Sequence, residues 1–256
     1  MEMYDNENTV QKSFDEDFLP EELLQAQWAE FIELKKIITE LFNRKQSPLH
    51  VLDIGIGNAR IARHLSGVKE LWDMIAVYDG TDNALPCIKI SNEIIKQLNI
   101  DDKVAVHFFD AVNLSQWKKK YDLIITTWFT AGNFYPDDFD FDNYRPGTLD
   151  LSHNKKFEQI FSGAYSLVNP GGEIVIGACY IDNDNTRKKQ ESFYQKMGMT
   201  VITNGKDNFT ATKERFWSQR FTEEKLKTYF HFADPGKISS TPLDTYDFAR
   251  QVRIKK

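Results

Sequence analysis

Strand-like and helix-like segments alternate along most of this chain, and this alternation constrains the fold more than any other feature of the sequence. Short runs rich in β-branched and aromatic residues predict strands, and the longer segments between them predict helices. The predicted strands are residues 49–55, 73–79, 103–110, 121–128 and 172–180, and the predicted helices are 58–67, 84–98, 152–168 and 186–197. Repeated strand–helix–strand units build a parallel sheet that is covered on both faces. The chain is therefore expected to form a doubly wound, Rossmann-like α/β fold.

The two ends of the chain differ from this central pattern. Residues 1–18 are polar with scattered aromatic residues and predict an irregular arm, whereas residues 20–42 carry the period of an amphipathic helix that begins at Pro20. After Gly198 the alternation stops, and short β-rich segments with a hairpin signal predict antiparallel strands. We expect a mostly parallel seven-stranded sheet with an antiparallel C-terminal edge and an N-terminal helical cap.

Length and composition exclude several classes of protein. The 256 residues are compatible with one domain, in which the arm and cap helix, residues 1–47, belong together with residues 48–256. The net charge of −6 and the lack of a broad basic stretch disfavour nucleic acid as a partner. Cys87 and Cys179 are far apart, so neither a metal site nor a disulfide is expected. The acidic N-terminus and the absence of a long apolar run predict a cytoplasmic protein without a membrane span.

The stretch HVLDIGIGNARIARHL, residues 50–65, joins a predicted strand to a predicted helix through two glycines. Such turns bind nucleotides because glycine lets backbone N–H groups approach the ligand and because the N-terminus of a helix favours anions. The dinucleotide fingerprint G-x-G-x-x-G needs a third small residue, but Arg60 stands in that place. The turn therefore indicates a nucleotide ligand and disfavours NAD.

Three aspartates lie at the ends of three predicted strands. Asp53 precedes the glycines in a D-x-G-x-G pattern, Asp79 ends the second strand, and Asp110 ends the third. Open parallel sheets bind ligands at the carboxyl ends of their strands, so we expect these carboxylates to share one site. Three carboxylates repel a pyrophosphate, but they suit a ligand that carries a cationic amine, a ribose diol and an adenine amino group.

The segment 49–181 resembles the class I S-adenosylmethionine-dependent methyltransferases. The resemblance rests on LDIGIGNA, on the pattern D-x-T-x-x-x-L after the second strand, on YDLIITTW and on the Pro-Gly-Gly turn of LVNPGGEIVI. It implies S-adenosylmethionine as the cofactor and methyl transfer as the reaction. The implied cofactor-binding residues are Asp53, Gly55 and Gly57 at the methionine end, Asp79 and Thr81 at the ribose, Asp110 and Ala111 at the adenine, and Thr127 and Trp128 beside the methyl group. In similar enzymes an N-terminal segment covers the cofactor, so the arm around Tyr4 is either such a cover or a frayed terminus.

The pocket for the methyl acceptor is expected in the unusually long loop after the fourth strand, residues 128–153. Its aromatic residues predict a flat-walled pocket with one polar anchor. The expected acceptor-binding residues are Phe129, Asn133, Phe134, Tyr135 and Trp217, and the candidates for a catalytic role are Asn133, Tyr135 and His153. The loop lacks the N/D-P-P-Y/F motif, which disfavours methylation of nucleobases.

The same loop carries an acidic run, formed by Asp137, Asp138, Asp140 and Asp142. A solvated acidic surface is the simpler interpretation, and attraction of an amine-bearing acceptor is the alternative. An amine that arrives neutral needs no general base, and the sequence offers no obvious one. We therefore predict a methyltransferase that acts on a small molecule, preferably at nitrogen. The alternatives are a peptide or O-methyltransferase, an NAD-dependent oxidoreductase and a catalytically silent cofactor-binding protein; the oligomeric state is not predicted.

Overall fold

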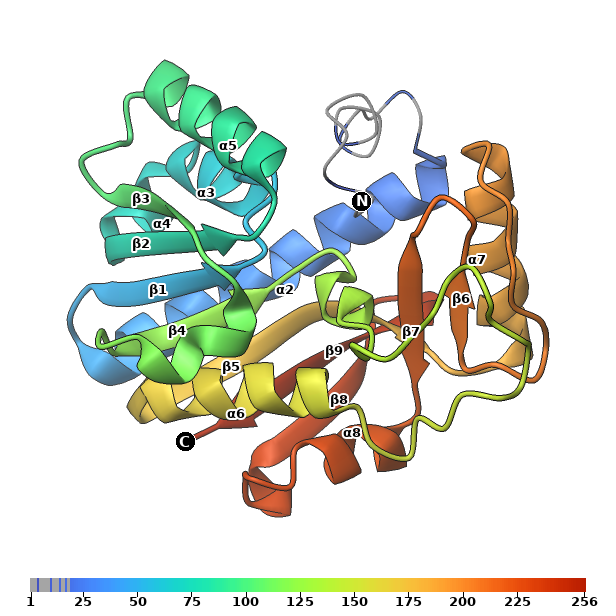
Figure 1. The fold of residues 1–256 in the computed structure, drawn as a ribbon. Coiled ribbons are helices and arrows are strands. Elements are labelled where there is room, and N and C mark those ends of the chain that lie inside the picture. The colour runs from blue at the N-terminus through green and yellow to red at the C-terminus, as the bar shows by residue number, and fades with distance from the viewer. Residues whose placement is uncertain (1–3, 5–9, 11–13, 15–16, 18) are drawn as a thin grey trace.

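Figure 1 shows the computed structural model of the protein, which describes Tyr4, Val10, Phe14, Asp17 and residues 19–256. Most of the expected arm, residues 1–18, lies outside the described residues. Among the helices of the described part, none is both long enough and apolar enough to cross a membrane.

The predicted alternation of strands and helices is present in the structure. Its elements are β1 (Leu49–Ile54), α3 (Arg60–Ser66), α4 (Lys69–Asp73), β2 (Ile75–Asp82), α5 (Leu85–Leu98), β3 (Val104–Phe108), η3 (Ala111–Gln116), β4 (Tyr121–Thr126), η4 (Thr130–Asn133), α6 (Lys155–Leu167), β5 (Val168–Ile181) and α7 (Asp184–Lys196). The C-terminal part adds β6 (Phe209–Ala211), β7 (Trp217–Phe221), α8 (Glu223–Tyr229), η5 (Pro235–Lys237), β8 (Ile238–Leu243) and β9 (Tyr246–Lys255). The largest difference from the predicted bounds is at β5, which begins four residues earlier; β2 ends three residues later.

The strands form a mostly parallel sheet. Strands β3, β2, β1, β4 and β5 are parallel neighbours in this order, β9 pairs antiparallel with β5, and β8 pairs antiparallel with β9. These seven strands confirm the predicted fold class and its antiparallel C-terminal edge. The described sheet has nine strands rather than seven. Strand β5 extends beyond β4 and pairs at Tyr180 and Ile181 with β7, and β7 pairs antiparallel with β6. This extra hairpin lies at the carboxyl end of the sheet.

The central strands are buried on both faces because their alternate residues contact different layers. In β1, Leu52 and Ile54 pack with Phe157 and Phe161 of α6, whereas Val51 packs with helix residues on the opposite face. Helices α6 and α2 cover opposite faces of the sheet, as Figure 1 shows. The nearly continuous apolar strands of the sequence therefore form the middle layer of a three-layer core.

The N-terminal cap is the long helix α2 (Glu21–Lys45). It follows Pro20, carries acidic residues in its first turn and basic residues in its last turn, and so complements the helix dipole at both ends. Its apolar face, which includes Leu34, Ile37, Ile38 and Leu41, packs on the sheet and on α3. One charged residue of this buried face, Glu30, reaches the carboxyl end of the sheet and contributes to the site described next.

Candidate functional site

A cavity of about 420 Å³ lies at the carboxyl ends of the parallel strands. This volume is in the usual range for small-molecule sites. One half is formed by the β1–α3 turn and the ends of β2 and β3, with Asp53, Gly55, Gly57, Arg60, Thr81, Asp82, Asn83, Phe109, Asp110 and Ala111. The other half is formed by the loop after β4, the start of α6 and the β6–β7 turn, with Thr127, Trp128, Thr130, Asn133, Phe134, Tyr135, Lys156, Ile160, Arg215, Phe216 and Trp217. Tyr4 and Phe14 also line the cavity, so these two residues of the expected arm lie where a cofactor cover would lie.

Most of the residues predicted for the site are brought together in this cavity. They are Asp53, Gly55, Gly57, Thr81, Asp110, Ala111, Thr127, Trp128, Asn133, Phe134, Tyr135 and Trp217. Their roles toward a ligand stay predictions. Asp79, Phe129 and His153 are not among the lining residues, and each has a structural role elsewhere.

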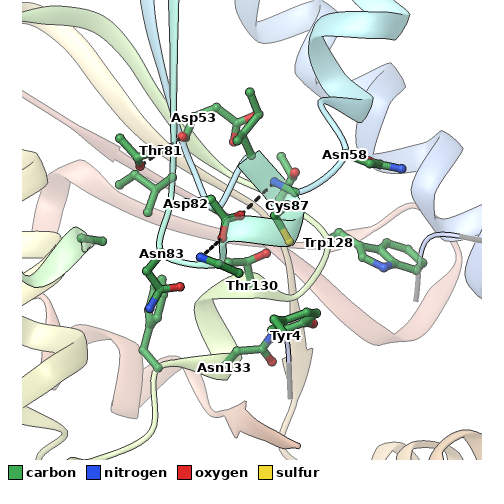
Figure 2. A pocket seen from close by; sticks show the side chains of 18 of the residues that line it. Tyr4, Asp53, Asn58, Thr81, Asp82, Asn83, Cys87, Trp128, Thr130 and Asn133 are labelled. Carbon is green, nitrogen blue, oxygen red and sulfur yellow. Dashed lines mark hydrogen bonds between the residues drawn. The ribbon is translucent and has the colours of Figure 1, made fainter. Parts of the chain in front are cut away.

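The glycine turn after β1 is shaped by close neighbours. Gly55 and Gly57 have φ angles of +75° and +57°, which glycine adopts without strain. A Cβ atom on Gly57 would lie 3.0 Å from the ring of Phe14, so a larger residue would also collide with the side chain above it. The turn is tied to β2, since the Gly57 N–H donates to the Asp82 carboxylate at 3.0 Å. Figure 2 shows this carboxylate in the middle of the cavity.

Asp82, not Asp79, is the carboxylate that β2 presents to the cavity. Pairing with β3 continues through Thr81 and Asp82, so the strand ends three residues beyond its predicted end. The Asp82 carboxylate accepts hydrogen bonds from the N–H groups of Gly57 and Ala84, at 3.0 and 2.9 Å. Its pKa is raised because burial opposes the charged form.

Asp79 lies deeper in the sheet and holds neighbouring elements together. Its buried carboxylate is 2.8 Å from His107 Nε2 and accepts hydrogen bonds from Lys119 and Tyr121 at 2.9 Å. Burial opposes its charged form, but these hydrogen bonds outweigh burial and keep its pKa below the ordinary value. Asp79 is thus not among the residues that line the cavity, where the ribose is expected.

Two residues of the acceptor loop are also corrected. Phe129 is stacked on Tyr180, with ring centroids 3.8 Å apart, and belongs to the core rather than to the acceptor pocket. His153 is exposed at the start of α6, with its Nδ1 2.9 Å from Glu158 Oε1. It is thus removed as a candidate base for chemistry inside the cavity.

Four lining residues each carry a buried polar atom without a hydrogen-bond partner: Asp53 Oδ1, Arg60 Nη1, Asn133 Oδ1 and Trp217 Nε1. Unpaired buried polar atoms are costly, and in a cavity they indicate where a ligand completes the hydrogen bonding. The other Asp53 oxygen accepts a hydrogen bond from Tyr78 at 2.6 Å. Burial raises the pKa of Asp53 to about 7.

Arg60 and Glu30 form a buried ion pair that the sequence analysis did not predict. Arg60 Nη2 lies 2.6 Å from Glu30 Oε2, and the other Glu30 oxygen accepts a hydrogen bond from the Trp128 N–H at 2.8 Å. The carboxylate has room because Gly177 lies beneath it: a Cβ atom there would be 2.3 Å from Glu30 Oε1. Helix α2 therefore fixes both Arg60 and the start of the acceptor loop. The available sequence signal was a charged residue on the apolar face of an amphipathic helix.

No known family profile matches the sequence, and no curated protein matches it at a significant level. Solved structures do resemble the fold. An S-adenosylmethionine-dependent methyltransferase from Clostridium acetobutylicum aligns over 90% of each chain with 12% identity and a TM-score of 0.54. The PH0226 protein from Pyrococcus horikoshii aligns over 85% of this chain and 86% of its own, with 14% identity and a TM-score of 0.56. An O-methyltransferase family protein from Burkholderia thailandensis aligns over 88% of this chain and 55% of its own, with 11% identity and a TM-score of 0.55, so this chain spans about half of its length.

This chain has the fold of the class I S-adenosylmethionine-dependent methyltransferases. The resemblance noted in the sequence is thereby confirmed at the level of the fold. At these identities the comparisons do not identify a methyl acceptor.

Proposed function

We propose that the protein is an S-adenosylmethionine-dependent methyltransferase that acts on a small molecule. The observation that carries the proposal is the pair Asp53 and Arg60. Both are buried in the cavity wall beside the glycine turn, and each has an unpaired atom there. A carboxylate and a guanidinium side by side complement the ammonium and carboxylate of an α-amino acid, which is one end of this cofactor.

The remaining residues of this half fit the nucleoside end of the cofactor. We assign Asp82 to the ribose hydroxyls, and Asp110 and Ala111, which follow the neighbouring strand β3, to the adenine; all three line the cavity. When bound, the cofactor supplies an electrophilic methyl group on a sulfonium, so the protein mainly has to orient the acceptor.

The structure also argues against a dinucleotide. In dinucleotide sites the backbone N–H groups of the glycine turn face the pyrophosphate. Here the Gly57 N–H is bound to the Asp82 carboxylate, which would repel a phosphate in that place. An NAD-dependent oxidoreductase is therefore disfavoured by the same turn that first suggested a nucleotide.

Nitrogen remains the preferred target of methylation. Two features favoured it, the acidic loop and the lack of a general base, and only the second is retained. The acidic loop residues do not line the cavity: Asp137 pairs with Lys156, Asp142 pairs with Arg215, and Asp140 accepts hydrogen bonds within its own loop. The run thus gives no support to attraction of an amine. Among the described residues that line the acceptor half there is no histidine, aspartate or glutamate to serve as a base, and a neutral amine needs none. Asn133 Oδ1 is an unpaired acceptor that could orient an N–H group.

Methyl transfer from S-adenosylmethionine labelled in its methyl group tests this proposal. Purified protein is expected to label aromatic amines such as aniline derivatives, and to label the matched phenols at least about tenfold more slowly, because the described lining of the acceptor half has no histidine, aspartate or glutamate to take the phenol proton. Labelling confined to phenols would contradict the preference for nitrogen. Failure to bind the cofactor would contradict the proposed function as a whole.

Cofactor binding is expected to depend on pH through Asp53. Its pKa in the ligand-free protein is about 7, above the ordinary 3.8, so the folded protein keeps this proton where the unfolded chain has lost it. The stability of the ligand-free protein should therefore fall as the pH rises from about 4 to about 7. Because a cationic amine favours the ionised carboxylate, affinity for S-adenosylhomocysteine should rise over the same range, by at most about tenfold per pH unit, and level off above pH 7.

Calorimetric titrations between pH 5 and 8 would measure this dependence. The ligand's amino group stays protonated below about pH 7, so the change reports on the protein. Asp53→Asn keeps the shape of the side chain and should remove the dependence. A wild-type profile that is flat below pH 7 would contradict the assignment of Asp53 to the amine.

A further inference from the structure

The two halves of the cavity differ in charge. The acids that line it are Asp53 in β1, Asp82 at the end of β2 and Asp110 after β3, and they belong to the cofactor half together with the cations Arg60 and Arg63. In the acceptor half, the charged residues among the described lining residues are Lys156 of α6 and Arg215 of the β6–β7 turn, and both are cationic. The methyl acceptor therefore meets a positively charged wall.

The two cations lie beside an aromatic wall formed by Tyr135, which lines the cavity, and by Phe141, which packs against Tyr135 and is not among the lining residues. Lys156 Nζ lies 5.0 Å from the centre of the Tyr135 ring, and Arg215 Cζ lies 5.9 Å from the centre of the Phe141 ring. These two rings contact each other edge to face, with centroids 5.3 Å apart. Segments far apart in the sequence thus bring an ammonium and a guanidinium to two aromatic rings that contact each other.

A third donor lies on this wall. Trp217 is 2% exposed, its ring centre is 6.2 Å from that of Tyr135, and its Nε1–H has no hydrogen-bond partner. A buried indole N–H normally finds an acceptor. An oxyanion of a bound ligand would supply the acceptor that this donor lacks.

The present partners of the two cations are easily replaced. Asp137 and Asp142 lie 2.9 and 2.7 Å from Lys156 and Arg215, but their side chains are 82% and 71% exposed and neither lines the cavity. Ion pairs with such exposed carboxylates are weak because water screens them. A ligand anion inside the cavity can therefore bind both cations without leaving a buried charge unpaired.

We propose that the methyl acceptor is a planar small molecule that carries an anionic group, a carboxylate or a phosphate ester, bound by Lys156, Arg215 and the Trp217 Nε1–H. Its planar part lies against the aromatic wall, and its nucleophile faces Asn133. This inference rests on the proposed function, and it specifies the class of acceptor that the site selects.

The test uses para-substituted anilines of similar size whose substituents differ in charge. Protein saturated with S-adenosylhomocysteine is titrated with 4-aminobenzoate, 4-aminophenyl phosphate, neutral 4-aminobenzamide and cationic 4-(aminomethyl)aniline. At least one of the two anions is expected to bind at least about tenfold more tightly than the amide, and the stronger of the two identifies the group. Tenfold is a modest expectation for hydrogen bonds to charged groups.

Substitutions locate the effect. Lys156→Gln and Arg215→Gln should each weaken binding of the anion by about tenfold, while affinities for 4-aminobenzamide and S-adenosylhomocysteine stay unchanged. Lys155→Gln and Lys213→Gln are matched controls, because these exposed lysines are close neighbours in sequence and are not among the lining residues. They should change anion binding by less than twofold.

The outcomes separate this inference from the function on which it rests. Normal binding of S-adenosylhomocysteine with no preference for either anion, or with preference for the diamine, overturns the inference and leaves the methyltransferase proposal standing. Loss of anion binding that is equal in the lysine controls also overturns it. Failure of S-adenosylhomocysteine to bind overturns both.

Discussion

Replacement of Glu30 by alanine is expected to lower the free energy of unfolding by about 3–5 kcal/mol, the usual cost of removing one partner from a buried ion pair. Arg60 is 8% exposed and would keep its charge without a counter-ion, and the Trp128 N–H would lose its acceptor. Urea unfolding measures the change. Glu33→Ala is a control on the same helix, because Glu33 forms only an exposed pair with Lys36, and it should change stability by less than about 1 kcal/mol.

A double variant distinguishes stability from function at this pair. Glu30→Met with Arg60→Met fills the space with apolar side chains and leaves no charge unpaired, so it should recover much of the stability lost in Glu30→Ala. It should still bind S-adenosylhomocysteine more weakly than the wild type, because the guanidinium assigned to the ligand carboxylate is gone. If Glu30→Ala is no less stable than Glu33→Ala, the buried pair contributes no more to the free energy of unfolding than the exposed one.

Exchange of Asp82 for asparagine is expected to weaken binding of S-adenosylhomocysteine by tens- to about a hundredfold. Charge-assisted hydrogen bonds to a ribose diol contribute on the order of 2–3 kcal/mol, and the amide can no longer accept hydrogen bonds at both terminal atoms. One of the Gly57 and Ala84 N–H groups would therefore lose its acceptor, which also loosens the glycine turn. Calorimetric titration measures the affinity.

Asp79→Asn should show the opposite behaviour. It should reduce the stability of the fold by about 1–3 kcal/mol, because Asp79 accepts hydrogen bonds from Lys119 and Tyr121 in the buried part of the sheet. Its affinity for S-adenosylhomocysteine should stay within about twofold of the wild type. A large loss of affinity in Asp79→Asn with little effect in Asp82→Asn would reverse the assignment and restore the prediction made from the sequence.

The ribose assignment moved from Asp79 to Asp82, and this change shows which part of the site could not be predicted from the sequence. Hydrophobic alternation predicted the order of strands and helices, and with it the edge of the sheet where Asp53, Asp110 and the glycine turn lie. The end of β2 was not decided by local pattern, because the apolar run ends at Tyr78, before Asp79, although the strand continues to Asp82. It depends on pairing of Thr81 and Asp82 with β3, which is a tertiary contact.

Other features that could not be predicted from the sequence also depend on tertiary contacts. Phe129 is turned into the core by stacking on Tyr180, and Asp137 and Asp142 of the acidic loop pair with Lys156 and Arg215, which come from α6 and from the β6–β7 turn. These contacts join segments that are distant in sequence, so composition and spacing within the loop could not predict them. Residue types that suit an adenosyl ligand were recognisable, whereas their partners were not.

The cavity at the ends of β1, β2 and β3 is expected to hold an adenosyl amino acid. A crystal structure of the protein with S-adenosylhomocysteine would decide this. The expected complex has the ribose hydroxyls on the Asp82 carboxylate, the ammonium on Asp53 and the ligand carboxylate on Arg60. A ligand bound outside this cavity, or bound within it with none of these three side chains in contact, would contradict the claim.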